Sequence, residues 1–354
     1  MSSEVIKIKG RKIGEGQPVF IIGEIAQAHD GSLGTAHAYI DAVASTGADA
    51  VKFQTHIAEA ESSLREQWRV NFSYQDKTRF DYWKRMEFTR EQWKGLKRHA
   101  EEKGLIFLSS PFSSEAVGLL ERIGISAWKV ASGEVNNRFI LNHIARTRLP
   151  VLLSSGMSDL KEIDNAVGIL NKEKIDFAVL QCTSMYPCPP EKAGINLISF
   201  FKERYGCPIG LSDHTGKIYS ALAAVAVGAS IIEAHIVLSR ECFGPDVSSS
   251  LTTAEFKDMV EGAAYIRKMF SNPVDKDLSY KDTLKVKKLF NKSIVYNKSL
   301  HKGEVLKESH LASVKPGTGI TPDKIENYIG KTMAKDVSKG DLLKTEDLED
   351  KYQK

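Results

Sequence analysis

Short hydrophobic runs alternate with longer amphipathic stretches along the chain between Phe20 and about Phe270. The runs have the length of buried strands, and in the stretches between them apolar residues recur at helical spacing. In the stretch TAHAYIDAVASTG, for example, Ile40 and Val43 share one helical face, and Gly47 marks the end of the helix. Strands that alternate with helices in this way predict parallel βα units.

The number of hydrophobic runs decides between two architectures. Eight runs are found, at Val19–Glu24, Ala48–Gln54, Leu105–Ser110, Ala127–Ser132, Val151–Ser155, Phe177–Cys182, Ile209–Ser212 and Ser230–Ile236. Eight βα repeats over about 250 residues are typical of a (β/α)₈ (TIM) barrel, whereas an open doubly wound sheet has fewer strands. The sequence therefore predicts an α/β protein with a TIM barrel.

The pattern changes after Ser271, where a polar, lysine-rich stretch begins. Beyond it, two segments, KSLHKGEVLKESHL and KDVSKGDLLKTEDL, share the pattern K-x-[LV]-x-K-G-[ED]-x-L-K-x-x-x-L, which indicates a small module with internal pseudo-symmetry. We therefore predict three parts: a barrel over residues 1–275, a linker over residues 276–286, and a small, mostly β domain over residues 287–354.

The composition argues against a membrane-spanning, a secreted and a nucleic-acid-binding protein. Of the 354 residues, 42% are hydrophobic and 27% are charged, and no apolar run is long enough to span a membrane. The first residues, MSSEVIKIKGRK, contain no apolar core of a signal peptide, and the four cysteines include no CxxC pair, so we expect a cytoplasmic protein with reduced thiols. The net charge of +4 is not concentrated in a Lys/Arg block beside aromatic residues, which argues against a nucleic-acid partner.

Polar side chains gather where the predicted strands end, which in a TIM barrel is where chemistry takes place. All eight strands contribute, with Glu24, Lys52, Gln54, Ser110, Lys129, Ser132, Glu134, Ser154, Tyr186, Ser212, His214, Glu233 and His235 at or just beyond the ends. A single serine of this kind is most often a helix cap, but a complete ring of polar strand ends favours a site. Two lysines and four serines in this ring are suited to binding a phosphate and a carboxylate on one small substrate. No GxGxxG or Walker A motif is present, so we expect side chains and strand-end amides to hold the anion.

His214 and His235 lie one βα unit apart, so neighbouring strands would bring both imidazoles to the same rim of the barrel. There they could bind one cation. No third histidine and no cysteine accompanies them in the pattern, which argues against a closed zinc site and favours an open site filled by Mn²⁺ or Mg²⁺. The alternative is that each histidine only hydrogen-bonds a backbone carbonyl group.

Several motifs carry a resemblance to a known family. They are IIGEIAQAHDGSLGTAHAYIDAVASTGADAVKFQTHIAE, KVASGEVNN, LSSGM, QCTSMYPCPPE, GLSDHT, IIEAHI and GPDVSSSL, in this order over about residues 18–348. Together they resemble the N-acetylneuraminate (sialic acid) synthase family, and the C-terminal segment resembles the antifreeze-like (SAF) domain of that family. The resemblance implies a transferase that condenses phosphoenolpyruvate with an N-acetylated hexosamine, N-acetylmannosamine in the type case, to give a nine-carbon 2-keto sugar acid and phosphate.

The resemblance also implies roles for individual residues. His214 and His235 match the metal ligands of the family. The expected metal ion is Mn²⁺, and Mg²⁺ and Co²⁺ are the alternatives. Contacts with phosphoenolpyruvate match Lys52, Ser110, Lys129, Ser132, Ser154 and Ser212, and contacts with the sugar match Glu24, Gln54, Asn71, Tyr186 and Asp246. Glu134 matches a carboxylate near the reacting carbons. The catalytic candidates are therefore Glu134, Glu24 and the two histidines. Glu233 is expected to orient a ligand or a water molecule.

Two positions depart from the family pattern. Many bacterial members carry Arg-Pro-Gly in the tail, where the arginine of one subunit reaches the active site of its neighbour in a homodimer with exchanged C-terminal domains. There it contacts the N-acyl group of the sugar, so the resemblance makes Lys315 a candidate sugar contact. This chain has Lys315 before Pro316 and Gly317, which keeps the charge but not the planar guanidinium. On the eighth strand the family often has a lysine or arginine where this chain has Ala234.

These departures leave the acceptor sugar open between N-acetylmannosamine and the di-N-acetylated hexoses of legionaminic and pseudaminic acid synthesis. A second hypothesis is a phosphoenolpyruvate condensation with an aldose phosphate, which would require a basic cluster beyond Lys52 and Lys129. A third, prompted by the antifreeze-like tail, is a non-catalytic ice- or glycan-binding protein, which would leave the polar strand ends without a purpose.

Overall fold

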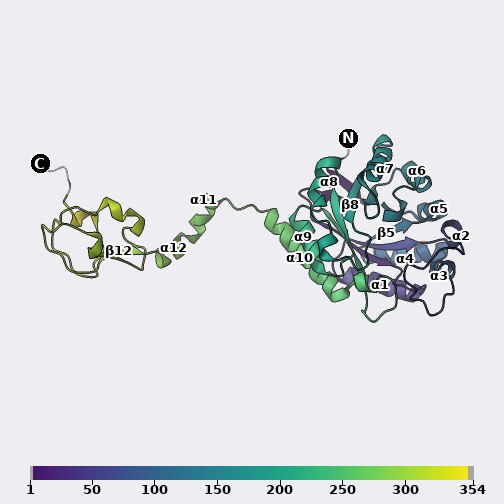
Figure 1. Ribbon diagram of the computed structural model, residues 1–354, viewed down its shortest axis with the longest axis horizontal. Coiled ribbons are helices and arrows are strands. Elements are labelled where there is room, and N and C mark those ends of the chain that lie inside the picture. The colour runs from purple at the N-terminus through teal and green to yellow at the C-terminus, as the bar shows by residue number, and fades with distance from the viewer. Residues whose placement is uncertain (1–2, 350–354) are drawn as a thin grey trace. The chain divides into compact units, whose positions relative to one another are not determined.

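The computed structural model describes residues 3–349, and it divides the chain into two compact units, one up to Asn272 and one from Pro273 onward (Figure 1). No helix within the described range is both long and apolar enough to cross a membrane.

The first unit is an eight-stranded parallel barrel. Its strands are β3 (Phe20–Ala26), β4 (Ala50–Thr55), β5 (Ile106–Pro111), β6 (Trp128–Val130), β7 (Val151–Ser154), β8 (Phe177–Cys182), β9 (Ile209–Asp213) and β10 (Ile231–Val237). They pair in the order β5-β4-β3-β10-β9-β8-β7-β6, and β5 also lies against β6, which closes the barrel. The predicted TIM barrel is thus confirmed, with every predicted strand in place. The strand β6 is shorter than predicted because the chain turns into a 3₁₀ helix at Ser132–Glu134.

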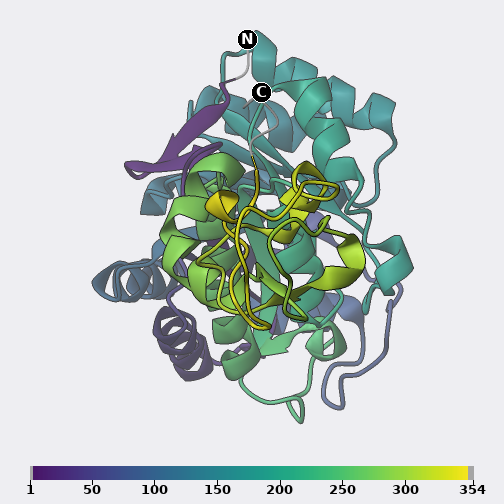
Figure 2. The same ribbon diagram turned by 90° about the vertical axis from the view of Figure 1, so that its left-hand side faces the viewer.

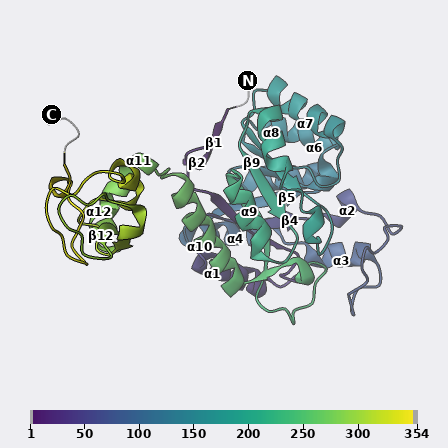
Figure 3. The ribbon, with the colours of Figure 1, turned by 60° about the vertical axis from the view of Figure 1, so that its left-hand side comes forward.

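Helices cover the outside of the barrel (Figure 3). They are α1 (Leu33–Ser45), α4 (Arg90–Glu102), α5 (Ser114–Ile123), α6 (Arg138–Arg146), α7 (Leu160–Lys172), α8 (Leu197–Tyr205), α9 (Ile218–Ala226) and α10 (Thr253–Phe270), with two short helices, α2 (Ala58–Glu61) and α3 (Arg79–Met86), between β4 and α4. The face of α1 that carries Ile40 and Val43 is buried, as predicted, and Gly47 follows the helix with a left-handed φ of 81°.

A β-hairpin that the sequence analysis did not predict closes the N-terminal end of the barrel. It consists of β1 (Val5–Ile8) and β2 (Arg11–Gly14), seen at the N-terminal end of the chain in Figure 2. Its side chains Ile6, Ile8 and Ile13 are fully buried in the same apolar cluster as residues at the starts of the barrel strands, such as Phe20 and Ile106. Apolar packing therefore fills this end, and the polar strand ends lie at the opposite, C-terminal end.

The second unit begins with helical turns. The segment predicted as a linker contains α11 (Lys276–Ser279), a 3₁₀ helix (Tyr280–Thr283) and the first part of α12 (Leu284–Phe290). Beyond this segment, β12 (Ser293–Tyr296) and β13 (Leu311–Val314) pair in an antiparallel arrangement. The second unit has a small apolar core of its own.

The predicted pseudo-symmetry of the second unit is visible in its backbone. Leu300 and Val337 occupy the same position of the two sequence repeats, and each donates its N–H to the carbonyl oxygen of the other, at 3.1 and 3.0 Å. Equivalent glycines, Gly303 and Gly340, both adopt left-handed φ values of 87° and 94°. The two repeats therefore form the same local structure around this pair.

Candidate active site

A cavity of about 420 Å³ opens at the C-terminal ends of the barrel strands. Each of the eight strands supplies at least one side chain to it. Of the residues singled out from the sequence, those that line the cavity are Glu24, Lys52, Gln54, Ser110, Lys129, Ser132, Glu134, Ser154, Tyr186, Ser212, His214, Glu233, His235 and Asp246. The ring of polar strand ends is therefore one contiguous site.

Two predicted residues are not part of this cavity. Asn71 is exposed on the loop between α2 and α3 and does not line the cavity, although its neighbours Val70 and Phe72 do. Lys315 belongs to the second unit, where its ammonium group lies 4.8 Å from the centroid of the Phe290 ring. The sugar contacts of both residues stay predictions.

The floor of the cavity is a buried layer of two lysines and two glutamates. Lys52 Nζ lies 2.8 Å from Glu24 Oε2 and 3.7 Å from Glu233 Oε2, and Lys129 Nζ lies 3.3 Å from Glu233 Oε1. This arrangement follows from strand register, because Glu24 is paired with Lys52 in the barrel sheet. Four charges out of contact with water are tolerated only when they neutralise one another, so the layer acts as a unit.

Burial and charge act against each other on the pKa values in this layer. Burial raises the pKa of Glu24 and lowers that of Lys129. Burial also acts to raise the pKa of Glu233, but the ammonium groups of Lys129 and Lys52 outweigh it and hold that pKa at about 2. Glu233, which contacts both lysines, is consequently the carboxylate of the layer that is held most firmly in its ionised form.

Each of the two ammonium groups donates to a serine hydroxyl, and a third serine hydroxyl donates to Glu233. Lys129 Nζ donates to Ser154 Oγ at 2.6 Å, Lys52 Nζ donates to Ser110 Oγ at 3.3 Å, and Ser212 Oγ donates to Glu233 Oε1 at 2.9 Å. The hydroxyls and ammonium groups together provide the donors that a phosphate and a carboxylate on one small molecule would need.

Gly156, the glycine of the LSSGM motif, lies where there is no room for a side chain. A Cβ atom on Gly156 would lie 2.5 Å from Ser184 Oγ, 2.6 Å from Ser132 Oγ and 2.7 Å from Cys182 Sγ. The backbone N–H of Gly156 donates to Ser132 Oγ at 3.1 Å. The missing side chain therefore lets the backbone approach Ser132 and fix its hydroxyl at the cavity wall.

The two histidines lie side by side at the rim. Their ring centroids are 5.3 Å apart, and Tyr186 stacks on His214 at 4.2 Å. His214 Nδ1 donates to the carbonyl oxygen of Thr183 at 2.9 Å, which leaves the Nε2 lone pair available. His235 makes no hydrogen bond to any residue in the range 3–349, so the carbonyl-bonded alternative applies to His214 alone.

The sequence analysis overlooked a cysteine beside this pair. Cys182, the last residue of β8, lies with its Sγ 3.9 Å from His214 Nδ1 and also lines the cavity. Within the described part of the chain no group of three or more His, Cys, Asp or Glu side chains could hold a metal ion. Two free imidazole nitrogens on one rim fit a cation whose other ligands come from outside the protein, and they do not fit a closed site.

The outer wall of the cavity comes from the segment between β4 and α4, in which the sequence predicted only Asn71 as a site residue. It supplies His56, Glu61, Glu66, Trp68, Arg69, Phe72, Arg79, Tyr82 and Trp83. Arg69 Nη2 lies 2.8 Å from Asp246 Oδ1, and its guanidinium group lies 4.5 Å from the Tyr186 ring centroid. The signal available in the sequence was a cluster of aromatic and arginine residues in an unusually long βα connection.

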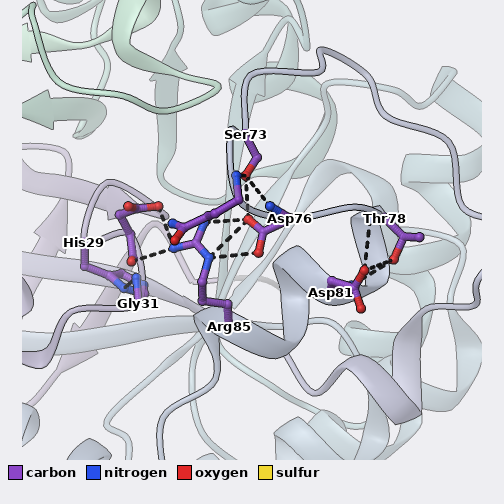
Figure 4. A network of polar contacts seen from close by, with 9 residues as sticks. His29, Gly31, Ser73, Asp76, Thr78, Asp81 and Arg85 are labelled. Atoms are coloured by element: carbon purple, nitrogen blue, oxygen red, sulfur yellow. Dashed lines mark hydrogen bonds and ion pairs between the residues drawn. The ribbon is translucent and has the colours of Figure 1, made fainter.

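A polar network fixes this segment in place (Figure 4). Arg85 on α3 donates through Nη1 to the Asp30 carbonyl and carboxylate oxygens, both at 2.8 Å, and through Nη2 to Asp76 Oδ2 at 2.7 Å. Asp76 also accepts a hydrogen bond from the Ser73 hydroxyl at 2.7 Å. One guanidinium group thus ties the loop that carries the outer wall to the loop after β3.

Replacement of Glu233 by glutamine is expected to destabilise the barrel by about 3 to 5 kcal/mol, because it leaves two buried ammonium groups with one carboxylate. Denaturant unfolding monitored by tryptophan fluorescence would measure the loss. The matched control is Glu261→Gln on α10, whose exposed ion pair with Lys257 at 3.9 Å should contribute less than about 1 kcal/mol. A Glu233→Gln protein as stable as this control would contradict the assignment of Glu233 as the counter-ion.

Comparison with known proteins identifies the family. The model of the NeuB family matches residues 39–275, which is more than half of the chain, and the model of the SAF domain matches residues 291–349. The chain is 32% identical over 360 residues to an N-acetylneuraminate-9-phosphate synthase from Homo sapiens, with 100% of this chain and 99% of the human one covered. It is 32% identical over 330 residues to an N,N'-diacetyllegionaminic acid synthase from Campylobacter jejuni subsp. jejuni, with 92% and 98% covered.

A solved structure agrees with these relatives. The crystal structure of an N-acetylneuraminic acid (sialic acid) synthetase from Leptospira borgpetersenii in complex with citrate matches with a TM-score of 0.72 and 32% identity, covering 80% of this chain and 96% of that one. The resemblance inferred from the motifs is confirmed. The chain therefore belongs to the NeuB family of phosphoenolpyruvate-dependent nonulosonate synthases and carries a C-terminal SAF domain.

Proposed function

We propose that this enzyme condenses phosphoenolpyruvate with N-acetylmannosamine, or with a related unphosphorylated N-acetylated hexose, to give a nine-carbon 2-keto acid and phosphate. The observation that carries the proposal is the buried layer in which Lys52 and Lys129, with serine hydroxyls around them, form the floor of a sugar-sized cavity. Phosphoenolpyruvate, with a phosphate and a carboxylate on three carbons, suits these donors.

The outer half of the cavity supports an acceptor without a phosphate group. The human relative is named for a 9-phosphate product and the Campylobacter relative is not, so the relatives leave this point open. Besides the two floor lysines, the arginines lining the cavity are Arg69 and Arg79, and each is paired with a carboxylate, Asp246 at 2.8 Å and Glu66 at 2.8 Å. A phosphate on the acceptor would have to compete with these carboxylates, which disfavours the aldose-phosphate hypothesis.

In the reaction that we propose, C3 of phosphoenolpyruvate attacks the C1 aldehyde of the open-chain sugar, water adds at C2, and the tetrahedral intermediate loses phosphate by C–O cleavage. Lys52, Lys129 and the serines hold phosphoenolpyruvate, and Glu24 and Gln54 orient the acceptor. Glu134 transfers a proton near the reacting carbons or positions the water. His214 and His235 would hold a divalent cation, for which Mn²⁺ is the first candidate. When bound, this cation would polarise the aldehyde oxygen.

A phosphate-release assay with phosphoenolpyruvate and a panel of acceptors tests this function. The panel should contain N-acetylmannosamine, N-acetylmannosamine 6-phosphate, a 2,4-di-N-acetylated hexose, arabinose 5-phosphate and a sample without acceptor, each with Mn²⁺. We expect release with an unphosphorylated N-acetylated hexose and a matching product mass. Preference for a phosphorylated sugar would overturn the acceptor assignment, and no release with any acceptor would favour the ice- or glycan-binding alternative.

We also propose that the enzyme is a cytoplasmic homodimer in which each C-terminal domain covers the active site of the partner. The four cysteines are free thiols, which agrees with a reducing compartment. The dimer rests on the family resemblance and on the chemistry, because a cover would exclude bulk water from the reacting carbons.

A chain ending at Phe270 is expected to stay folded and to lose most of its sugar-dependent activity. It should stay folded because the apolar clusters of the barrel contain no residue beyond α10. Mixing it with full-length Glu134→Gln protein should restore part of the activity, since the truncated barrel would receive the tail of the mutant subunit. Phosphate release measures the rescue. A strictly monomeric full-length protein in sedimentation, or no rescue where subunit exchange is demonstrated, would argue against this arrangement.

A further inference from the structure

One buried histidine beside the cavity has no role in the proposed reaction. His56 follows β4 and is 5% exposed. Its ring is stacked between Trp83, at 3.9 Å and 17°, and Phe112, at 4.4 Å and 13°. An imidazole held between two parallel aromatic faces can neither swing away nor tilt, so its two nitrogen atoms are aimed at fixed points.

Each nitrogen of His56 faces a hydrogen-bond acceptor. Nδ1 lies 2.5 Å from Glu61 Oε1, and Nε2 lies 3.3 Å from Gln54 Oε1. The orientation of the Gln54 amide is independently set, because Gln54 Nε2 donates to Glu24 Oε1 at 3.0 Å and Gln27 Nε2 donates to Gln54 Oε1 at 3.2 Å. An amide oxygen can only accept a hydrogen bond, so the contact between His56 and Gln54 Oε1 requires the proton to be on Nε2.

These contacts connect the outer wall to the floor of the cavity. The connection runs from Glu61 through His56 to the Gln54 amide, from that amide to Glu24, and from Glu24 to Lys52 at 2.8 Å. Gln54 and Glu24 both line the cavity, and their side chains would present a donor and an acceptor to the sugar. Loss of the His56 contact would leave Gln54 Oε1 held by Gln27 alone.

We infer that His56 is a positioning residue for the acceptor sugar: held by Glu61 and two aromatic rings, it fixes the Gln54 amide and through it the Glu24 carboxylate. This inference rests on the proposed function, in which these two side chains orient the acceptor. His56 itself does not act on the reacting atoms, so its loss should affect binding of the acceptor and leave binding of phosphoenolpyruvate unaffected.

Two substitutions separate the two hydrogen bonds of His56. In His56→Asn the side-chain amide nitrogen takes the place of Nδ1, so the contact with Glu61 is kept and the donor to Gln54 is lost. In His56→Gln the amide nitrogen takes the place of Nε2, so the donor to Gln54 is kept. We expect kcat/KM for the acceptor to fall by about tenfold to 10²-fold in His56→Asn and clearly less in His56→Gln, with KM for phosphoenolpyruvate unchanged in both. His143→Asn, which alters a partly exposed histidine 3.8 Å from Glu121 on the outside of the barrel, is the matched control.

A measurement without substrate tests the same inference. ¹⁵N NMR of histidine-labelled full-length enzyme at pH 7.5 should show a proton on Nε2 of His56, with the resonance assigned by its absence in His56→Gln. In Glu61→Gln the amide can donate to Nδ1, so we expect Nδ1 to be unprotonated there and Nε2 to keep its proton. An unprotonated Nε2 in the native enzyme would overturn the inference, and so would equal acceptor kinetics in His56→Asn and His56→Gln. Because this measurement needs no turnover, it decides the His56 contacts even if the acceptor assay fails.

Discussion

A Glu134→Gln enzyme is expected to lose about 10²-fold or more of kcat while its KM for phosphoenolpyruvate changes little, because glutamine keeps the size of the side chain and cannot transfer a proton. Glu134 ends the 3₁₀ helix that follows β6, and it lines the cavity on the same rim as Lys129 and Ser132. Asn137 Nδ2 donates to Glu134 Oε2 at 2.7 Å, so one carboxylate oxygen is held and the other is free for substrate. Initial rates with saturating acceptor measure the loss.

The pH dependence of kcat provides an internal check on this role. Burial, more than the neighbouring charge of Glu61, raises the pKa of Glu134 above that of an ordinary carboxyl group. If the carboxylate accepts a proton during turnover, activity should disappear as the pH falls through this raised value, and the glutamine variant should lack that acid limb. Glu115→Gln on the exposed side of α5 serves as the control. Near-normal kcat in Glu134→Gln would restrict Glu134 to a binding role.

Strand-end chemistry could be predicted from the sequence because two simple rules act together. A buried strand is a short hydrophobic run, so its last residue can be read directly, and parallel strands in a closed barrel place all these last residues on one rim. Lys52 and Glu233 are far apart in the chain, yet counting strands was enough to place them in one cavity. The same rule located Ser154 and His214.

The outer wall of the cavity and the N-terminal β-hairpin could not be predicted in this way. Trp68, Arg69 and Trp83 lie in or beside an irregular loop, and their positions depend on the long-range contacts of Arg85 with Asp30 and Asp76. No periodicity encodes such contacts. Each strand of the hairpin β1–β2 has only four residues. Its few apolar side chains cannot be assigned to a core from the sequence until the barrel end that they cover is known.

Cys182 shows a limit of reasoning from spacing. The spacing of His214 and His235 predicts that they lie on neighbouring strands, and the stretch of sequence between them contains no third histidine and no cysteine. In the barrel, however, β9 also has β8 beside it, and the last residue of β8, Cys182, lies with its Sγ 3.9 Å from His214 Nδ1. Such a neighbour is predictable only from the order of the strands in the closed barrel, and not from spacing along the chain.

Removal of divalent metal is expected to abolish turnover, and Mn²⁺ should restore it. The rim has two imidazoles with a free nitrogen each and no third protein ligand in the described residues, so a bound cation would be held weakly enough for a chelator to remove. Without it the aldehyde oxygen would depend on hydrogen bonds alone for polarisation. The enzyme should be treated with EDTA, freed of chelator, and assayed for phosphate release with and without added Mn²⁺, Mg²⁺ or Co²⁺, with the metal content measured in parallel.

The variant His214→Ala tests which residues hold the cation. It should reduce Mn²⁺ affinity by well over tenfold in calorimetric titration, because loss of only an outer partner of a metal ligand already costs roughly 10- to 100-fold. Thermal stability should change little, because a rim side chain contributes little to the barrel core. The control His143→Ala, at a partly exposed histidine on the outside of the barrel, should alter neither property. His235→Ala should behave like His214→Ala if both imidazoles bind one ion. Full activity in thoroughly metal-free enzyme would refute the metal site, and unchanged Mn²⁺ affinity in both rim variants would move the site away from these histidines.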